Sequence, residues 1–164
     1  SAASDVYKRQ GNMGSEMRMN YTMMGDTVNL AARLESSAKH YGVYNFVGEN
    51  IYEATKDEFI FRFLDFVRVK GKKIPVKVYE LVSSKENAKN SDINLIRAFE
   101  NGLDCYYQQN WEKAIKYFTE SQLMEDTFSS RNTTPSEVYI NRCIMFKDNP
   151  PAEDWDGVWT MISK

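Results

Sequence analysis

Cysteine and histidine are scarce in this sequence of 164 residues, which holds two Cys and one His. The two cysteines, Cys105 and Cys143, lie far apart and show neither CxxC nor Cys/His spacing, so neither a disulfide framework nor a zinc site is indicated. We expect both thiols to be reduced and buried as small hydrophobic side chains. Reduced cysteines are typical of the cytoplasm, which is the compartment that we predict.

An excess of one charge and a long hydrophobic run are also absent. The 21 Lys and Arg residues against 23 Asp and Glu residues give a formal net charge of -2, which argues against nonspecific binding of nucleic acid or of an anionic membrane. No apolar run approaches the roughly 20 residues that cross a bilayer, and no signal-peptide pattern is present. The composition, 42% hydrophobic, is that of a globular protein. We expect a soluble chain without a nucleic-acid partner or a membrane segment; a membrane anchor of a longer parent would lie upstream.

The first ten residues show no hydrophobic period, and we expect residues 1–10 to be a non-native or disordered lead-in. Reverse translation of Asp5–Gln10 resembles the transposon end sequence used in library adapters. Adapter read-through is therefore one interpretation of this segment, and an ordinary disordered tail is the other. The Gly-rich stretch Gly11–Ser15 that follows is interpreted as a turn.

Strand and helix patterns alternate between residues 17 and 82. Asp26 is suited to cap a helix that ends near His40, and Gly42 lies just past that end, where a glycine is common. The turn Gly71–Lys73 separates two alternating runs and predicts a hairpin. This α/β layer is short of strands for a closed core. The expected elements are the strand Met17–Thr22, the helix Asp26–His40, the strand Tyr44–Val47, the helix Glu49–Thr55, and hairpin strands that start at Phe59 and Val76.

The segment 83–91 is polar, lacks an apolar period and is expected to form a linker to a helical tail, 92–164. Apolar residues three and four apart predict helices at Ile93–Tyr107 and Trp111–Met124, and Pro135 opens a third helix. The first two helices resemble one tetratricopeptide repeat. A single repeat cannot stack on itself, so it needs another surface. The residues of the repeat pattern are Ala98, Gly102, Tyr106, Trp111, Ala114 and Phe118.

Asn29 and Arg33 lie one helical turn apart on the polar stripe of the helix predicted from Asp26. This pair suits an anionic ligand, because free N–H groups and the positive helix end are nearby and the guanidinium can bind phosphate oxygens bidentately. Periodicity alone favours another interpretation, a solvated stripe in which Arg33 reaches a carboxylate.

Six motifs between residues 11 and 82 settle the preference between these interpretations. They are GNMGS at Gly11–Ser15, Arg18, NYT at Asn20–Thr22, GDTVNLAARLE at Gly25–Glu35, VKGK at Val69–Lys72, and Val76–Leu81. Together they closely resemble the class III adenylate and guanylate cyclase catalytic domain. The resemblance implies an α+β fold: a partial ferredoxin-like catalytic domain with an incomplete sheet at residues 11–82, followed by a small all-α tail.

The resemblance also implies a role for four residues. Asn29 and Arg33 match the pair that stabilises the transition state as the ribose 3′-hydroxyl attacks the α-phosphate and pyrophosphate leaves. Thr22 matches the position that faces the purine, and a Thr there goes with adenine, so ATP is the expected substrate. Lys70 matches the residue that binds the terminal phosphate. Without the resemblance, Lys70 would be interpreted as part of a charged hairpin tip that keeps an edge soluble.

Magnesium or manganese is implied for the full-length parent, but we assign no metal ligand to this chain. Members of the family hold two metal ions with two Asp residues upstream of the GNxGS motif, and Asp5 is the one Asp that precedes it here. Active sites in this family form between two catalytic domains, so a homodimer is expected. We predict that this fragment alone is inactive.

Two other interpretations stay open from the sequence. The helical tail could be an interaction module that binds a partner, or that packs on its own cyclase domain and sets dimer geometry. The cyclase-like part could also be catalytically inactive, although Thr22, Asn29, Arg33 and Lys70 are all retained.

Overall fold

Contacts divide the chain into two units, residues 1–37 and residues 38–164, and each unit is described by itself. The segments that the computed structural model describes are 9–15 and 18–24, for which only the backbone is described, and 38–68, 75–125 and 132–158.

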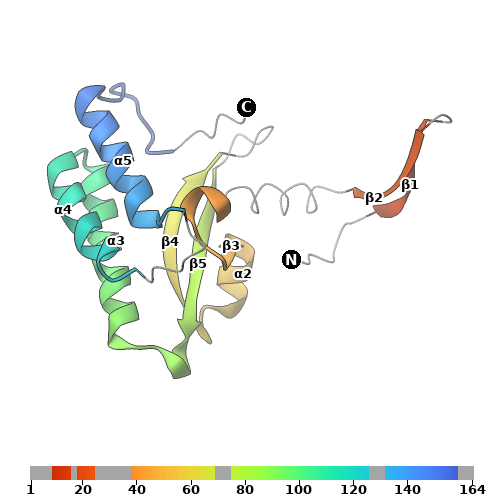
Figure 1. The fold of residues 1–164 in the computed structure, drawn as a ribbon, viewed down its shortest axis with the longest axis horizontal. Coiled ribbons are helices and arrows are strands. Elements are labelled where there is room, and N and C mark those ends of the chain that lie inside the picture. Colours follow the sequence, from red (N-terminus) through yellow and green to blue (C-terminus); the bar gives the residue numbers. More distant parts are fainter. Residues whose placement is uncertain (1–8, 16–17, 25–37, 69–74, 126–131, 159–164) are drawn as a thin grey trace. The chain divides into compact units, whose positions relative to one another are not determined.

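The first unit contains an antiparallel hairpin of two strands, β1 (Arg9–Ser15) and β2 (Arg18–Met24) (Figure 1). The Gly-rich stretch Gly11–Ser15 therefore lies in a strand, and our prediction of a turn there was wrong. The strand begins at Arg9, so its first two residues overlap the lead-in 1–10 that we expected. A ladder can accept this stretch because its backbone hydrogen bonds require no side chain. The strand predicted to begin at Met17 is confirmed as β2.

The second unit begins with the end of a helix. Residues 38–41 are helical, and Gly42 follows with φ of +66°. The N–H of Val43 donates to the carbonyl of Ala38 (3.1 Å), and the N–H of Gly42 donates to that of Lys39 (3.3 Å). This pair of bonds is the Schellman motif, which closes a helix at a left-handed residue. The predicted C-terminal glycine is confirmed, whereas residues 26–37 of the predicted helix lie outside the described residues.

Substitution of Gly42 is expected to be costly for two reasons. Other L-residues are strained at this φ, and an added Cβ would overlap the carbonyl oxygen of Thr133. We expect Gly42→Ala to lower the free energy of unfolding by about 2–4 kcal/mol, measured by denaturant titration. Gly42→Asn tolerates the left-handed backbone but keeps the overlap, so it should be nearly as harmful. Wild-type stability of Gly42→Asn would contradict a limiting contact with Thr133.

A three-stranded antiparallel sheet of order β3-β5-β4 forms the centre of this unit. Its strands are β3 (Phe46–Gly48), β4 (Phe59–Val67) and β5 (Val76–Ser84), and the short helix α2 (Glu49–Thr55) follows β3. The predicted hairpin is confirmed as β4 and β5, which pair from Phe59↔Ser84 to Val67↔Val76. Helix α2 has the predicted bounds. The tip of the hairpin, residues 69–74, lies outside the described residues.

Three helices follow the sheet: α3 (Asn90–Tyr107), α4 (Trp111–Gln122) and α5 (Pro135–Asp148). The predicted helical hairpin is confirmed, and Gln109 turns it with φ of +58°. Helix α3 comes so close to α4 that a Cβ on Gly102 would lie 2.6 Å from the ring of Phe118. Pro135 occupies the first turn of α5, as predicted, and Thr134 caps that helix by accepting from the N–H of Glu137 (3.2 Å). The likeness to a tetratricopeptide repeat stays a prediction.

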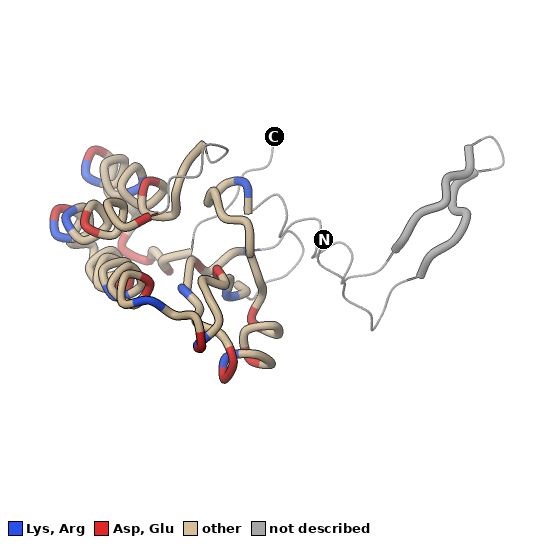
Figure 2. The backbone as a smooth tube through the Cα atoms, turned by 60° about the horizontal axis from the view of Figure 1, so that its bottom comes forward, with Lys and Arg blue, Asp and Glu red and all other residues tan. Residues whose placement is uncertain are grey.

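The three helices cover one face of the hairpin β4–β5, and α2 packs against β5 (Figure 1). The chain is therefore a mixed structure of helices and antiparallel strands. Both signs of charge are spread over this unit (Figure 2), as the nearly balanced composition predicts. The fully buried side chains between sheet and helices include Leu64, Val78, Phe99, Tyr106, Phe118 and Tyr139.

The expected linker, residues 83–91, contains regular structure at both of its ends. Ser83 and Ser84 complete β5, a 3-10 turn spans Lys85–Asn87, and α3 starts at Asn90. The sheet and the helices on either side of this segment belong to the same compact unit. The division into a cyclase-like part and a tail stays a prediction. In the structure, the described residues of both parts from residue 38 onward pack together.

Both cysteines are free and buried, as predicted. Burial raises the pKa of Cys143 to about 12, so its thiol stays protonated at neutral pH. Trp111 and Trp155 pack on Tyr106 and Phe146 with ring centroids 5.2–5.5 Å apart. Within the described residues, no helix combines the length and the apolar composition needed to span a membrane.

Candidate functional site

Of the four residues that the sequence assigns to catalysis and substrate binding, the structure describes only the backbone of one. The backbone of Thr22 lies in β2, opposite Gly11. Asn29, Arg33 and Lys70 lie outside the described residues. Their roles therefore stay predictions. What the structure does describe is how the elements next to them are held: the helix end at 38–41 and the two strands that flank Lys70.

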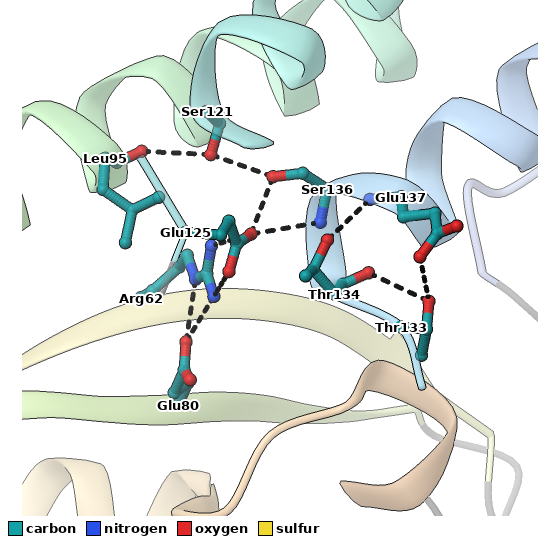
Figure 3. A network of polar contacts seen from close by, with 9 residues as sticks. All are labelled: Arg62, Glu80, Leu95, Ser121, Glu125, Thr133, Thr134, Ser136 and Glu137. Atoms are coloured by element: carbon teal, nitrogen blue, oxygen red, sulfur yellow. Dashed lines mark hydrogen bonds and ion pairs between the residues drawn. The ribbon is translucent and has the colours of Figure 1, made fainter. Parts of the chain in front are cut away.

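Buried charges hold these elements against the tail. The Arg62 cluster, defined as Arg62, Glu80, Glu125, Ser121 and Ser136, joins β4 and β5 to the helices (Figure 3). Arg62 is 1% exposed and stands directly across from Glu80 in the strand pairing. Such burial is favourable only if each charge is paired and hydrogen-bonded.

Arg62 meets this condition through two carboxylates. Its Nε and Nη2 donate to Oε2 of Glu80 (2.9 and 2.5 Å). Its Nη1 and Nη2 donate to the two oxygens of Glu125 (2.7 and 3.1 Å), which is a bidentate pair. Burial opposes the charged form of Arg62, but both carboxylates outweigh it and raise the guanidinium pKa above its usual value.

Glu125 links Arg62 to the helices through hydrogen bonds with Ser136. Its Oε1 accepts from the backbone N–H (3.3 Å) and from the hydroxyl (2.8 Å) of Ser136 in the first turn of α5. That position also places the negative charge at the positive end of the helix. The Oγ of Ser136 lies 2.9 Å from the Oγ of Ser121, which donates to the carbonyl of Leu95 (3.4 Å). Polar contacts therefore run from β5 through β4 to all three tail helices (Figure 3).

The Arg142 cluster, defined as Arg142, Asp65 and Tyr41, joins three other points of the unit. Nη1 of Arg142 on α5 donates to Oδ2 of Asp65 on β4 (2.6 Å). The hydroxyl of Tyr41 donates to the same oxygen (2.5 Å) and accepts from Nη2 of Arg142 (3.0 Å). Tyr41 and Asp65 are fully buried and Arg142 is 4% exposed.

The electrostatics of this cluster follow from its burial. Burial raises the pKa of the Tyr41 hydroxyl well above its usual value, and the negative charge of Asp65 adds to that effect. Burial disfavours the charged form of Arg142, but Asp65 raises the guanidinium pKa overall. Tyr41 is therefore a neutral hydrogen-bond donor, and the Arg142 guanidinium stays charged.

These clusters do not fit a metal ion. The carboxylates of Asp65, Glu80 and Glu125 are each engaged by a guanidinium, and a cation in either place would face that positive charge. Nor does any group of three or more potential ligands gather among the described residues. We therefore assign no step of a reaction to a metal held by these residues.

Sequence reasoning missed the two clusters. A weak signal was available, because Arg62 and Asp65 interrupt an otherwise apolar and aromatic strand. Their partners could not be found from spacing, since Glu125 lies 63 residues after Arg62 and Arg142 lies 77 residues after Asp65.

Comparisons with known proteins add an independent line of evidence. No protein-family model matches the chain. The chain is 36% identical over 138 residues to the terminal-differentiation specific adenylate cyclase of Dictyostelium discoideum, a match that covers 82% of this chain and 6% of that protein. It is 39% identical over 72 residues to adenylate cyclase 1 of Rhizobium meliloti (strain 1021), covering 44% of this chain and 11% of that protein.

Two further similarities complete the comparison. The adenylate cyclase of Anabaena cylindrica is 34% identical over 74 residues, covering 43% of this chain and 15% of that protein. The chain is also 33% identical to the adenylyl cyclase CyaB from P. aeruginosa, whose crystal structure is known. That match covers 49% of this chain and 40% of that one, with a TM-score of 0.35. The chain thus spans 6 to 15% of the length of these curated relatives. The sequence similarities support a cyclase domain in this chain.

The extents of the matches differ in an informative way. Two of them are 72 and 74 residues long, close to the length of the cyclase-like segment 11–82. The Dictyostelium match covers 82% of the chain, and any stretch of that size in 164 residues includes the whole of α3 and α4. The first two tail helices are therefore part of the similarity to that relative.

Proposed function

We propose that this chain is part of an adenylate cyclase that converts ATP to cyclic AMP and pyrophosphate in cyclic nucleotide signalling. The observation that carries the proposal is the similarity to three curated adenylate cyclases, taken together with the intact GDTVNLAARLE run at Gly25–Glu35. The chain would supply one side of an active site that forms between two cyclase domains, in a homodimer of the parent.

Each of the proposed residues would have a separate role in the phosphoryl transfer. The 3′-oxygen of ATP attacks the α-phosphorus, the bond to the bridging oxygen of pyrophosphate breaks, and negative charge grows on the phosphate oxygens. Arg33 and Asn29 would meet that charge without rearranging, which is the usual source of such catalysis. Thr22 would select adenine, and Lys70 would bind the terminal phosphate. Divalent metal ions, which neutralise charge on the triphosphate when bound, would be held by residues outside this chain.

The described contacts favour an intramolecular role for the tail over an external one. Helix α3 packs against β4, Arg142 on α5 pairs with Asp65 on β4, and Glu125, after α4, pairs with Arg62 on the same strand. A repeat-like hairpin that needs a second surface therefore has one in its own chain. An inactive cyclase-like domain is the remaining alternative, and activity measurements decide it.

The test compares this chain with the longer protein that contains it. Incubated with ATP and Mg²⁺ or Mn²⁺, the chain alone is expected to give no cyclic AMP above a buffer blank, because one side of the site is missing. The longer protein should convert ATP, and should do so in preference to GTP because of Thr22. Product from the chain alone would contradict the composite site, and failure of the longer protein with both nucleotides would favour the inactive domain.

A further inference from the structure

The Arg142 cluster reaches the one described part of the predicted catalytic helix. Residues 38–41 are helical, and our sequence prediction places Asn29 and Arg33 upstream on the same helix. Tyr41, its last helical residue, makes no contact with solvent. Whatever fixes Tyr41 therefore fixes the described helical segment 38–41.

Tyr41 is restrained from several directions at once. Its hydroxyl donates to Asp65 on β4 and accepts from Arg142 on α5. The guanidinium carbon of Arg142 lies 5.5 Å from the centre of the Tyr41 ring, and the ring of Phe46 stacks on it with centroids 6.0 Å apart. Hydrogen bonds to charged groups in a buried site are strong and directional, so this arrangement defines a position more sharply than apolar packing does.

Arg142 is the member of the cluster that comes from the tail. It contacts both of the others, with Nη1 on Asp65 and Nη2 on Tyr41. Without it, the fully buried Asp65 would lose the cation that compensates its charge. The position of the helix end relative to β4 would then depend on a carboxylate that is no longer neutralised.

We propose that Arg142 is a positioning residue, which acts through Asp65 and Tyr41 to fix the helical segment 38–41 against β4. The catalytic consequence rests on the proposed function, because it assumes that Asn29 and Arg33 act on the phosphates. The structural part does not. The third helix of the tail then holds residues 38–41, the segment at which the helix predicted to carry Asn29 and Arg33 ends.

The structural part is tested on this chain by hydrogen exchange at Gly42 and Val43, whose amides close the helix end. Arg142→Gln and Tyr41→Phe are each expected to speed this exchange about tenfold or more. Glu125→Gln is the matched control, because it weakens the other connection between tail and sheet without touching Tyr41, and it should leave exchange at the two amides within about twofold. Unchanged exchange in Tyr41→Phe, which keeps the Asp65–Arg142 pair and so the fold, would overturn the proposal.

The catalytic consequence is tested in the longer protein. Arg142→Gln is expected to lower kcat for cyclic AMP formation about 10- to 100-fold, the cost of slight misplacement, with a much smaller change in KM for ATP. Arg142→Lys should recover part of the loss, because it restores the charge but not the two-pronged contact. Glu125→Gln should retain kcat. Equal losses in Glu125→Gln and Arg142→Gln would overturn the proposal, because any loosening of the tail would then suffice.

The two tests fail separately. A longer protein without cyclase activity would remove the proposed function and the catalytic consequence together, yet the exchange measurement would still decide whether Arg142 positions the helix end. Faster exchange with unchanged kcat would overturn the catalytic consequence and leave the proposed function standing.

Discussion

Arg33→Ala in the longer protein is expected to lower turnover of ATP by about 10² to 10³, which is the usual cost of removing one transition-state donor. Charge accumulates on the phosphate oxygens as the 3′-oxygen attacks, and an alanine leaves that charge without its guanidinium. The loss should therefore fall on kcat, whereas a residue that binds ATP and the transition state equally would change KM instead. Steady-state cyclic AMP formation at several ATP concentrations separates these outcomes.

Arg97→Ala supplies the matched control for that experiment. Arg97 is an exposed arginine on α3, so its loss removes the same charge from the molecule without disturbing the proposed site. It should leave kcat within about twofold, as expected for a surface substitution. Wild-type turnover in Arg33→Ala would return Arg33 to the other interpretation, a solvated side chain that reaches a carboxylate.

Arg62→Leu is expected to lower the free energy of unfolding of the chain by about 3–5 kcal/mol. The substitution leaves the carboxylates of Glu80 and Glu125 buried, close together and without their shared cation. Removing one partner from a buried cluster costs far more than the net contribution of the cluster, because the remaining charges have lost their solvent as well as their pair. Denaturant titration measures the effect.

Arg68→Leu is the control, since Arg68 follows the same strand and pairs with Asp156 at 2.5 Å, but the two side chains are 40% and 50% exposed. Its loss should cost no more than about 1 kcal/mol, because water screens the pair. A loss in Arg62→Leu that is no larger than this would contradict a buried, fully paired Arg62. Replacement of Arg62, Glu80 and Glu125 together by apolar residues should recover most of the stability, since no buried charge then remains.

Local signals predicted much of the secondary structure. Helix α2, the start of α5 at Pro135 and the glycine that ends the helix at Gly42 all depend on residues within one turn of the feature itself. The hairpin β4–β5 was equally clear, because aromatic and branched residues alternate on both of its strands. The strand β1 was missed because Gly11–Ser15 has no hydrophobic period, and its pairing with β2 depends on backbone bonds that side chains do not reveal.

The residues of the candidate site were less predictable from local signals than the secondary structure was. The roles of Thr22, Asn29, Arg33 and Lys70 were assigned only through the resemblance to a family. Without it, Asn29 and Arg33 would be interpreted as part of a solvated stripe, and Lys70 as part of a charged hairpin tip. Neither periodicity nor the family resemblance predicted the Arg62 cluster or the Arg142 cluster. Tyr41 is buried, but its partner Arg142 lies 101 residues away, and no spacing rule connects positions so distant.

The buried face of the hairpin has a practical meaning for shortened versions of this protein. Composition marks residue 82 as a natural place to cut. A cut there would remove Glu125 from Arg62 and Arg142 from Asp65. It would expose Leu64 and Val78 to water and leave Asp65 without its cation. A recombinant catalytic unit designed from the composition alone would thus lose the helices α3–α5 that pack on the hairpin β4–β5. A cut that keeps this packing lies beyond α5 rather than before α3.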